Sequence, residues 1–175
     1  VLATAPTSGG SVQLWDVRDP ADPRPFADPV PLGTRFTSSL AFSPDGATLV
    51  TGADDFSVQL WDIADPAAPV PWGDPLTGPE NLVRTAVISP DGRSLVVASA
   101  DSSIYAWDIA DPRAPIPTAV SGGHDAGVNA AAFGREGNVL VTGSDDHGVL
   151  MWDRDAAGNF TARPHPLRGH TGTVY

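Results

Sequence analysis

A Trp-Asp dipeptide recurs four times in this chain at an almost constant spacing. The tryptophans lie 46, 46 and 45 residues apart, at Trp15, Trp61, Trp107 and Trp152. The last three dipeptides each close the same pattern of an apolar run, a polar turn and an alternating run, in residues 48–62, 94–108 and 139–153. A looser copy occupies residues 1–16. A fixed period of this size predicts an array of structural repeats.

Each period contains four candidate strands. In the second period the first candidate, residues 37–42, is followed by Ser43-Pro44-Asp45-Gly46. This is a turn sequence, because Pro presets φ, Asp bonds back to the backbone and Gly accepts a left-handed conformation. The next candidate, residues 49–53, is apolar nearly throughout, which predicts a strand covered on both faces. The third, residues 57–62, alternates and should be half exposed.

The fourth candidate of that period, residues 69–72, contains two prolines. Proline is tolerated at a sheet edge, where its missing N–H breaks no ladder. The four candidates therefore predict an antiparallel sheet, with its strands ordered from an inner to an outer edge.

Composition excludes several classes of function. The formal net charge is −11, so nucleic acid and anionic membrane are not expected as main partners. All ten basic residues are Arg, which excludes lysine-dependent phosphate or Schiff-base chemistry. There is no Cys, and hence no disulfide, thiol nucleophile or thiolate metal site. No signal segment or membrane-spanning run is found, and we expect a cytoplasmic protein.

The Trp-Asp dipeptides, the Ser-Pro-Asp-Gly turns and the Gly-His pairs together resemble the WD-repeat family of β-propellers, over essentially the whole chain. The resemblance implies an all-β fold of four-stranded antiparallel blades, in a single partial propeller of about three and a half blades. The expected limits are 1–32 for an incomplete first blade, 33–78, 79–122 and 123–168 for three complete blades, and 169–175 for the start of another.

The Lys-free, Arg-, Ala-, Pro- and Asp-rich composition further suggests a bacterial protein of the actinobacterial type. The chain begins and ends within expected strands, so we expect a fragment of a longer array. A half-ring would expose the backbone edges of its inner strands. We therefore expect this piece alone to self-associate to complete a ring, or to be poorly soluble.

In the WD-repeat family a His, a Ser or Thr, an Asp and the strand-three Trp form a hydrogen-bonded tetrad. By this resemblance the last period has a complete tetrad, whereas Gly33 or Thr34 replaces His in the second period. In the third period Pro79 and Val97 replace His and Thr. The implied tetrad residues are His124, Thr142, Asp146 and Trp152, then Thr51, Asp55 and Trp61, and finally Asp101 and Trp107.

Other interpretations of the same residues are weaker. His124, Asp146 and a hydroxyl could form a nucleophilic triad, but Thr142 should face the blade interior and not a substrate pocket. The acid pairs Asp54-Asp55 and Asp145-Asp146 lack the ligand spacing of a Ca²⁺ loop. We therefore predict no catalytic residue, metal or cofactor. Trp72 has no equivalent in the other periods, and outer-strand packing is favoured over an anchor for a partner.

We predict a non-enzymatic scaffold that binds a protein partner, as the docking or sensor part of a larger bacterial signalling or regulatory protein. Its acidic loop face suits a basic or mixed-charge partner. The expected partner-face residues are Arg35, Phe36, Asp54, Glu80, Asn81, Asp125, Asp145 and His147. The alternative is a small-ligand or catalytic site in the central channel, completed by blades outside this chain; the inner-strand residues here, 38–40, 84–86 and 129–131, are sparse for catalysis.

Overall fold

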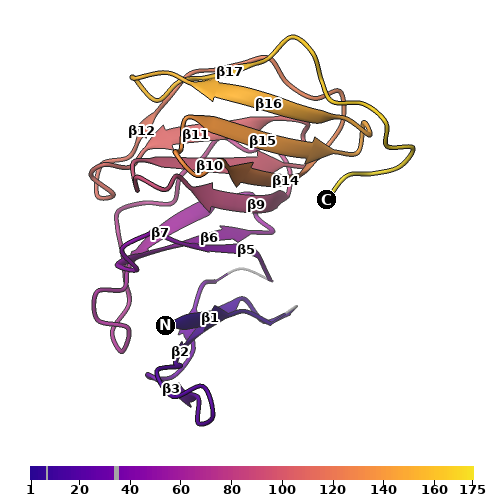
Figure 1. The fold of residues 1–175 in the computed structure, drawn as a ribbon. Helices are drawn as coiled ribbons and strands as arrows, with labels where there is room; N and C mark the ends of the chain where they lie inside the picture. Colours follow the sequence, from indigo (N-terminus) through magenta and orange to yellow (C-terminus); the bar gives the residue numbers. More distant parts are fainter. Residues whose placement is uncertain (7, 34–35) are drawn as a thin grey trace.

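The structure is a computed structural model that describes residues 1–6, 8–33 and 36–175. These residues form seventeen β-strands and no helix, arranged in four sheets that follow one another along the chain. Figure 1 shows the sheets stacked in sequence order, from the indigo N-terminal strands to the yellow C-terminal ones. The predicted all-β propeller fold is confirmed. No helix of these described ranges is long and apolar enough to cross a membrane.

The second and third sheets have the predicted strand order. From inner to outer edge the second contains β5 (Thr37–Phe42), β6 (Thr48–Ala53), β7 (Val58–Asp62) and β8 (Val70–Pro71). The third contains β9 (Val83–Ile88), β10 (Ser94–Ser99), β11 (Ile104–Asp108) and β12 (Ile116–Pro117). The proline-bearing strands β8 and β12 are the outer edges, where a missing N–H costs no ladder bond.

The first and fourth sheets depart from this plan at their outer edges. In the first, β1 (Leu2–Thr4) pairs with β2 (Ser11–Asp16), and both β3 (Arg24–Pro25) and β4 (Val30–Pro31) pair with β2. The fourth runs from β14 (Val128–Phe133) through β15 (Val139–Ser144) and β16 (Val149–Arg154) to β17 (Phe160–Ala162). A further strand, β13 (Val120–Ser121), pairs with β17 in parallel. The sequence pattern did not predict this parallel pair.

The Ser-Pro-Asp-Gly turns form because each polar group satisfies a nearby backbone donor. The hydroxyl of Ser43 accepts a hydrogen bond from the N–H of Thr48 at 2.9 Å, and the carboxylate of Asp45 accepts one from Ala47 at 3.0 Å. Gly46 has a φ of 73°, a left-handed conformation that favours glycine. The turn therefore fixes the register between the first and second strands.

The core lies between the sheets as three apolar clusters. All six residues of β6 and all six of β10 are buried, as expected for strands covered on both faces. In β10, Leu95 and Val97 join the cluster shared with the second sheet, whereas Val96 and Ala98 join the cluster shared with the fourth. Burial of each Leu or Val side chain in these clusters stabilises the folded state by about 1.5–3 kcal/mol. Stacking of neighbouring sheets thus supplies most of the core, as in other repeat arrays.

Close packing at the inner strands repeats along the array. A Cβ added to Gly52 would lie within 2.4 Å of a methyl group of Val83, and one added to Gly143 within 2.8 Å of Val174. Gly52 and Gly143 therefore leave the room that the valine of the following repeat needs against the second strand of the preceding one. Residues 169–175 contain no strand, yet Val174 occupies the same place as Val83.

Candidate functional site

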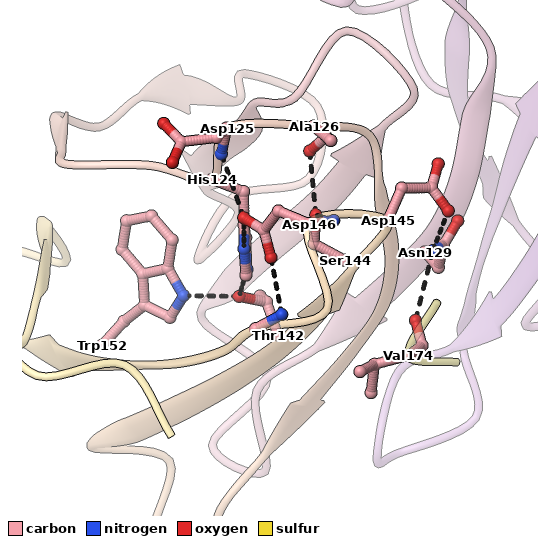
Figure 2. Close-up of polar contacts among 11 residues, drawn as sticks. His124, Asp125, Ala126, Asn129, Thr142, Ser144, Asp145, Asp146, Trp152 and Val174 are labelled. Atoms are coloured by element: carbon pink, nitrogen blue, oxygen red, sulfur yellow. Dashed lines mark hydrogen bonds and ion pairs between the residues drawn. The ribbon is translucent and has the colours of Figure 1, made fainter. Parts of the chain in front are cut away.

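The fourth sheet joins four side chains in one hydrogen-bonded chain. Trp152 Nε1–H donates to Thr142 Oγ1 at 2.9 Å, and His124 Nε2 lies 2.8 Å from that same hydroxyl. His124 Nδ1 lies 2.8 Å from Asp146 Oδ2. Because a carboxylate only accepts, Nδ1 carries the proton, and in the neutral imidazole Nε2 accepts from the Thr142 hydroxyl. Figure 2 shows the hydroxyl and the imidazole between the indole and the Asp146 turn.

The carboxylate of Asp146 is stabilised in its charged form. Burial raises its pKa, but hydrogen bonds from the backbone N–H groups of Asp125 and Gly148 and from His124 outweigh burial, so the pKa is lowered. The Trp152 and His124 side chains are buried, and Thr142 faces them and not a pocket. The group therefore fixes the loop before β14 against the turn after β15, and its geometry is that of a structural tie.

The other sheets keep only parts of this arrangement. In the second, Trp61 Nε1–H donates to Thr51 Oγ1 at 3.1 Å, and Asp55 accepts from the N–H and hydroxyl of Ser57. In the first, Trp15 donates to Thr4 at 2.8 Å. Sequence reasoning did not assign Thr4, although its pairing with Gln13 places it as Thr51 is placed against Gln59.

The third sheet replaces the polar group with apolar residues and a tyrosine. Val97 is fully buried where the threonines stand, and Pro79 is buried at the histidine position. Asp101 instead accepts hydrogen bonds from the Tyr105 hydroxyl at 3.0 Å and from the N–H of Glu80 at 2.7 Å. Tyr105 also stacks on Trp107, with ring centroids 6.3 Å apart. Within the described residues the indole N–H of Trp107 has no hydrogen-bond partner.

The loops that precede each first strand and the turns that follow each second strand lie at one end of the sheets. Backbone hydrogen bonds join them, from Asp54 to Phe36 at 3.3 Å, from Ala100 to Leu82 at 2.9 Å and from Asp145 to Gly127 at 2.9 Å. We call this end the loop face. The predicted partner residues lie on it; Glu80, Asn81, Asp125 and His147 are exposed, Phe36, Asp54 and Asp145 are half-buried, and Arg35 lies outside the described residues.

One turn position on the loop face has an unusual backbone. Phe56, Ser102 and His147 have φ values of 70°, 78° and 66°, and each stands five residues before the repeat tryptophan. Gly10 occupies this position in the first sheet, with a φ of 45°. Phe56 is also 38% exposed. Sequence reasoning named His147 but missed Phe56 and Ser102; their spacing from Trp61 and Trp107 was the available signal.

Inner-strand polar groups join neighbouring sheets. Arg84 of β9 donates to Asn129 of β14 and lies 3.0 Å from Asp145 Oδ2. Asn129 Nδ2 in turn donates to Asp145 Oδ1 at 2.9 Å and to the carbonyl of Val174 at 3.1 Å (Figure 2). The hydrogen bond from Asn129, followed by the one from Arg84, lowers the pKa of Asp145. Asp145 is therefore a structural link as well as a loop-face residue.

The remaining candidates also have structural surroundings. The hydroxyl of Ser39 accepts from the N–H of Ala86 at 2.8 Å, and that of Ser38 donates to the carbonyl of Gly52 at 3.1 Å. Trp72 is half-buried against the cluster between the second and third sheets, and Arg113 lies 5.7 Å from its ring centroid. The described residues contain no cluster of three or more His, Cys, Asp or Glu side chains that could hold a metal ion.

Comparison with protein families agrees with this geometry. The model of the WD domain, or G-beta repeat, matches residues 34–62, 74–108 and 116–153, which is more than half of the chain. The protein therefore belongs to the WD-repeat family. A search of curated proteins found no significant match. WD-repeat domains generally mediate protein–protein interaction and are generally non-catalytic.

Proposed function

We propose that the loop face binds a protein partner, and that the chain is the docking or sensor part of a larger bacterial signalling or regulatory protein. The observation that carries the proposal is the left-handed turn position. A non-glycine residue in this conformation costs about 1–2 kcal/mol, and Gly10 shows that the turn accepts glycine. Strained residues of this kind cluster where the side chain has a function. Here the side chains of Phe56 and His147 are presented to solvent.

The chemistry of the face indicates the kind of partner. Glu80 and Asp125 are exposed and acidic, and Asp54 and Asp145 add further carboxylates. Phe56 supplies an apolar side chain beside the Asp54-Asp55 pair. A basic or mixed-charge protein surface with an apolar contact fits this face. The net charge of −11 favours the same class of partner.

A small-ligand site in the central channel is the weaker proposal. It would need free polar groups on the inner strands, and Ser39, Arg84 and Asn129 already bond to neighbouring sheets. Polar groups that already bond to other parts of the chain are poor candidates for binding or catalysis, because a ligand would have to break those bonds.

The proposal is tested by affinity capture with three immobilised proteins: the wild-type chain, a Phe56→Gly/Asp125→Ala/His147→Gly variant, and a matched Arg135→Ala/Glu136→Ala variant. The last two residues are exposed in the turn at the opposite end of the fourth sheet. Native bacterial proteins retained by the wild type should be retained by the Arg135/Glu136 variant and reduced at least about tenfold by the loop-face variant, as expected when a central contact is lost. Equal retention by all three proteins would refute the proposal.

A further inference from the structure

The outer edge of the third strand is closed by two separate pieces of chain in three of the four sheets. In the second sheet β8 pairs at Trp61 and Asp62, and Leu76 pairs further along, at Val58. Leu76 accepts from the N–H of Val58 at 3.2 Å and donates to its carbonyl at 2.7 Å. Leu167 makes the same two bonds with Val149 in the fourth sheet, at 3.1 and 2.8 Å.

In the first sheet two pieces of chain also close the outer edge, but the second piece is a short strand and not a single paired residue. There β3 pairs at Trp15 and Asp16, and β4 pairs further along, where Val30 lies opposite Val12. Val12, Val58 and Val149 each stand three residues before the repeat tryptophan. Ile104 is the corresponding residue of the third sheet.

The second piece is missing at Ile104. Strand β12 pairs at Trp107 and Asp108, and Thr118 donates to the carbonyl of Ala106 at 2.9 Å. The chain then bonds to the next sheet, since the carbonyl of Ala119 accepts from Phe160 at 2.8 Å and β13, which stays beside β11, pairs with β17. Among the residues that the structure describes, none pairs with the backbone of Ile104 on this edge.

The backbone groups of Ile104 point to this edge by the alternation of the strand. The carbonyl of Ser103 accepts from Ser99 of β10 at 3.0 Å, whereas the carbonyl of Ala106 accepts from Thr118 on the outer side. Successive residues of an antiparallel strand direct their N–H and C=O groups to opposite sides. Ile104 therefore shares the direction of Ala106 and offers one donor and one acceptor.

A groove of about 550 Å³ lies along this open edge. Tyr105 and Trp107 form part of its lining, together with Thr77 and Thr118. The Trp107 indole N–H has no partner within the described residues, because Val97 stands where a threonine accepts elsewhere. The hydroxyl of Thr118 is likewise buried without a hydrogen-bond partner there. The groove thus combines aromatic surface, an open strand edge and the indole N–H of Trp107, which is unpaired within the described part of the chain.

We propose that this groove binds an extended peptide segment of a partner protein, which adds to β11 as an antiparallel strand. The chain itself shows the chemistry of the occupant. Leu76 and Leu167 fill the equivalent place in their sheets, and each follows a proline, Pro75 and Pro166. A segment with a Pro-Leu core therefore has the shape and the backbone groups that the open edge lacks. Main-chain bonds supply affinity in such strand addition, and side-chain pockets supply specificity.

Hydrogen exchange tests the open edge in the free protein. The N–H groups of Val58 and Val149 are bonded and should be protected, whereas that of Ile104 should exchange at least about tenfold faster. Ile104 exchange as slow as that of Val149 would overturn the proposal, because the chain's own 119–122 segment would then cover the edge.

Binding is tested with a synthetic heptapeptide of the sequence of residues 163–169. It should bind and slow exchange at Ile104 at least about tenfold, while Val58 and Val149 keep their rates. The same peptide with N-methylleucine lacks the N–H that would donate to Ile104, and should bind at least about tenfold more weakly. Binding that leaves Ile104 exchange unchanged, or equal binding of both peptides, would contradict strand addition.

A matched pair of variants locates the site. Thr77 lines the groove and is exposed, and Arg168 is its exposed counterpart beside Leu167. Thr77→Trp should fill the groove and weaken binding of the heptapeptide at least about tenfold, whereas Arg168→Trp should leave it unchanged. The reverse order would place the peptide elsewhere. These variants spare Phe56, Asp125 and His147, so this proposal and the loop-face proposal can fail independently.

Discussion

The third and fourth sheets pair their strands in the same register but surround the repeat tryptophan differently. In the fourth, Trp152, Thr142, His124 and Asp146 form a continuous polar chain. In the third, Val97 and Pro79 take two of these places, and Tyr105 bonds to Asp101. A buried polar network and an apolar replacement can support the same backbone, provided that the network is complete where it is present. The comparison predicts that the fourth sheet does not tolerate the valine of the third, whereas the third sheet tolerates the threonine of the fourth.

The largest expected effect comes from placing the valine of the third sheet in the fourth. Thr142→Val removes the acceptor of the Trp152 indole and the hydroxyl partner of His124, and both side chains stay buried. We expect the free energy of unfolding to fall by about 2–4 kcal/mol. Urea denaturation followed by tryptophan fluorescence measures it.

The reverse exchange is the control. Val97→Thr gives the Trp107 indole an acceptor and loses one buried methyl group, so the free energy of unfolding should change by less than about 1 kcal/mol. Equal losses in the two variants would show that the sheets do not differ in the way that their hydrogen bonds indicate.

An intermediate effect is expected from the turn aspartates and depends on pH. In the folded chain the pKa values of Asp146 and Asp101 are both lowered. A carboxyl group with a lowered folded pKa stabilises the fold above its unfolded value, near 3.8, and this contribution is lost as the pH falls through the folded value. Asp146→Asn should therefore destabilise the chain at pH 7 and much less at pH 3.

Asp101→Asn has the same sign but should cost less at pH 7, because no histidine depends on that carboxylate. Urea denaturation of both variants at pH 7, 5 and 3 measures the difference. A cost for Asp146→Asn that is independent of pH would contradict the role of its charged form.

The smallest effect is expected at the left-handed turn position, where the two sheets carry Ser102 and His147. Glycine relieves the strain but increases the entropy of the unfolded chain, so each change to Gly should stabilise by no more than about 1 kcal/mol. Thermal unfolding of Ser102→Gly and His147→Gly measures this. Destabilisation by more than that amount would show that the side chains support the turn.

Much of the fold follows from the repeat itself. The tryptophan spacing sets the register, the apolar second strands lie between sheets, and prolines mark β8 and β12 as edges. The parallel pair of β13 and β17 was not predictable. By residue type, Val120 and Ser121 fit the outer edge of the third sheet as well as that of the fourth. The Arg84–Asp145 link was not predictable either, since it joins residues far apart in the sequence through long side chains. Phe56 was missed because propensity gave no sign of a left-handed phenylalanine.

The contact between Gly52 and Val83 has a geometric consequence for the array. At the second strand this contact holds neighbouring backbones close together, whereas at the third strand an indole ring separates them. Each interface is therefore a wedge, and the stacked wedges give the arc its curvature (Figure 1). In the third sheet Ala98 stands in place of Gly52, opposite Val128, so that interface must accommodate one more methyl group at its narrow end. The side chain at this position therefore sets how closely neighbouring sheets pack at their second strands, and with it the curvature of the array.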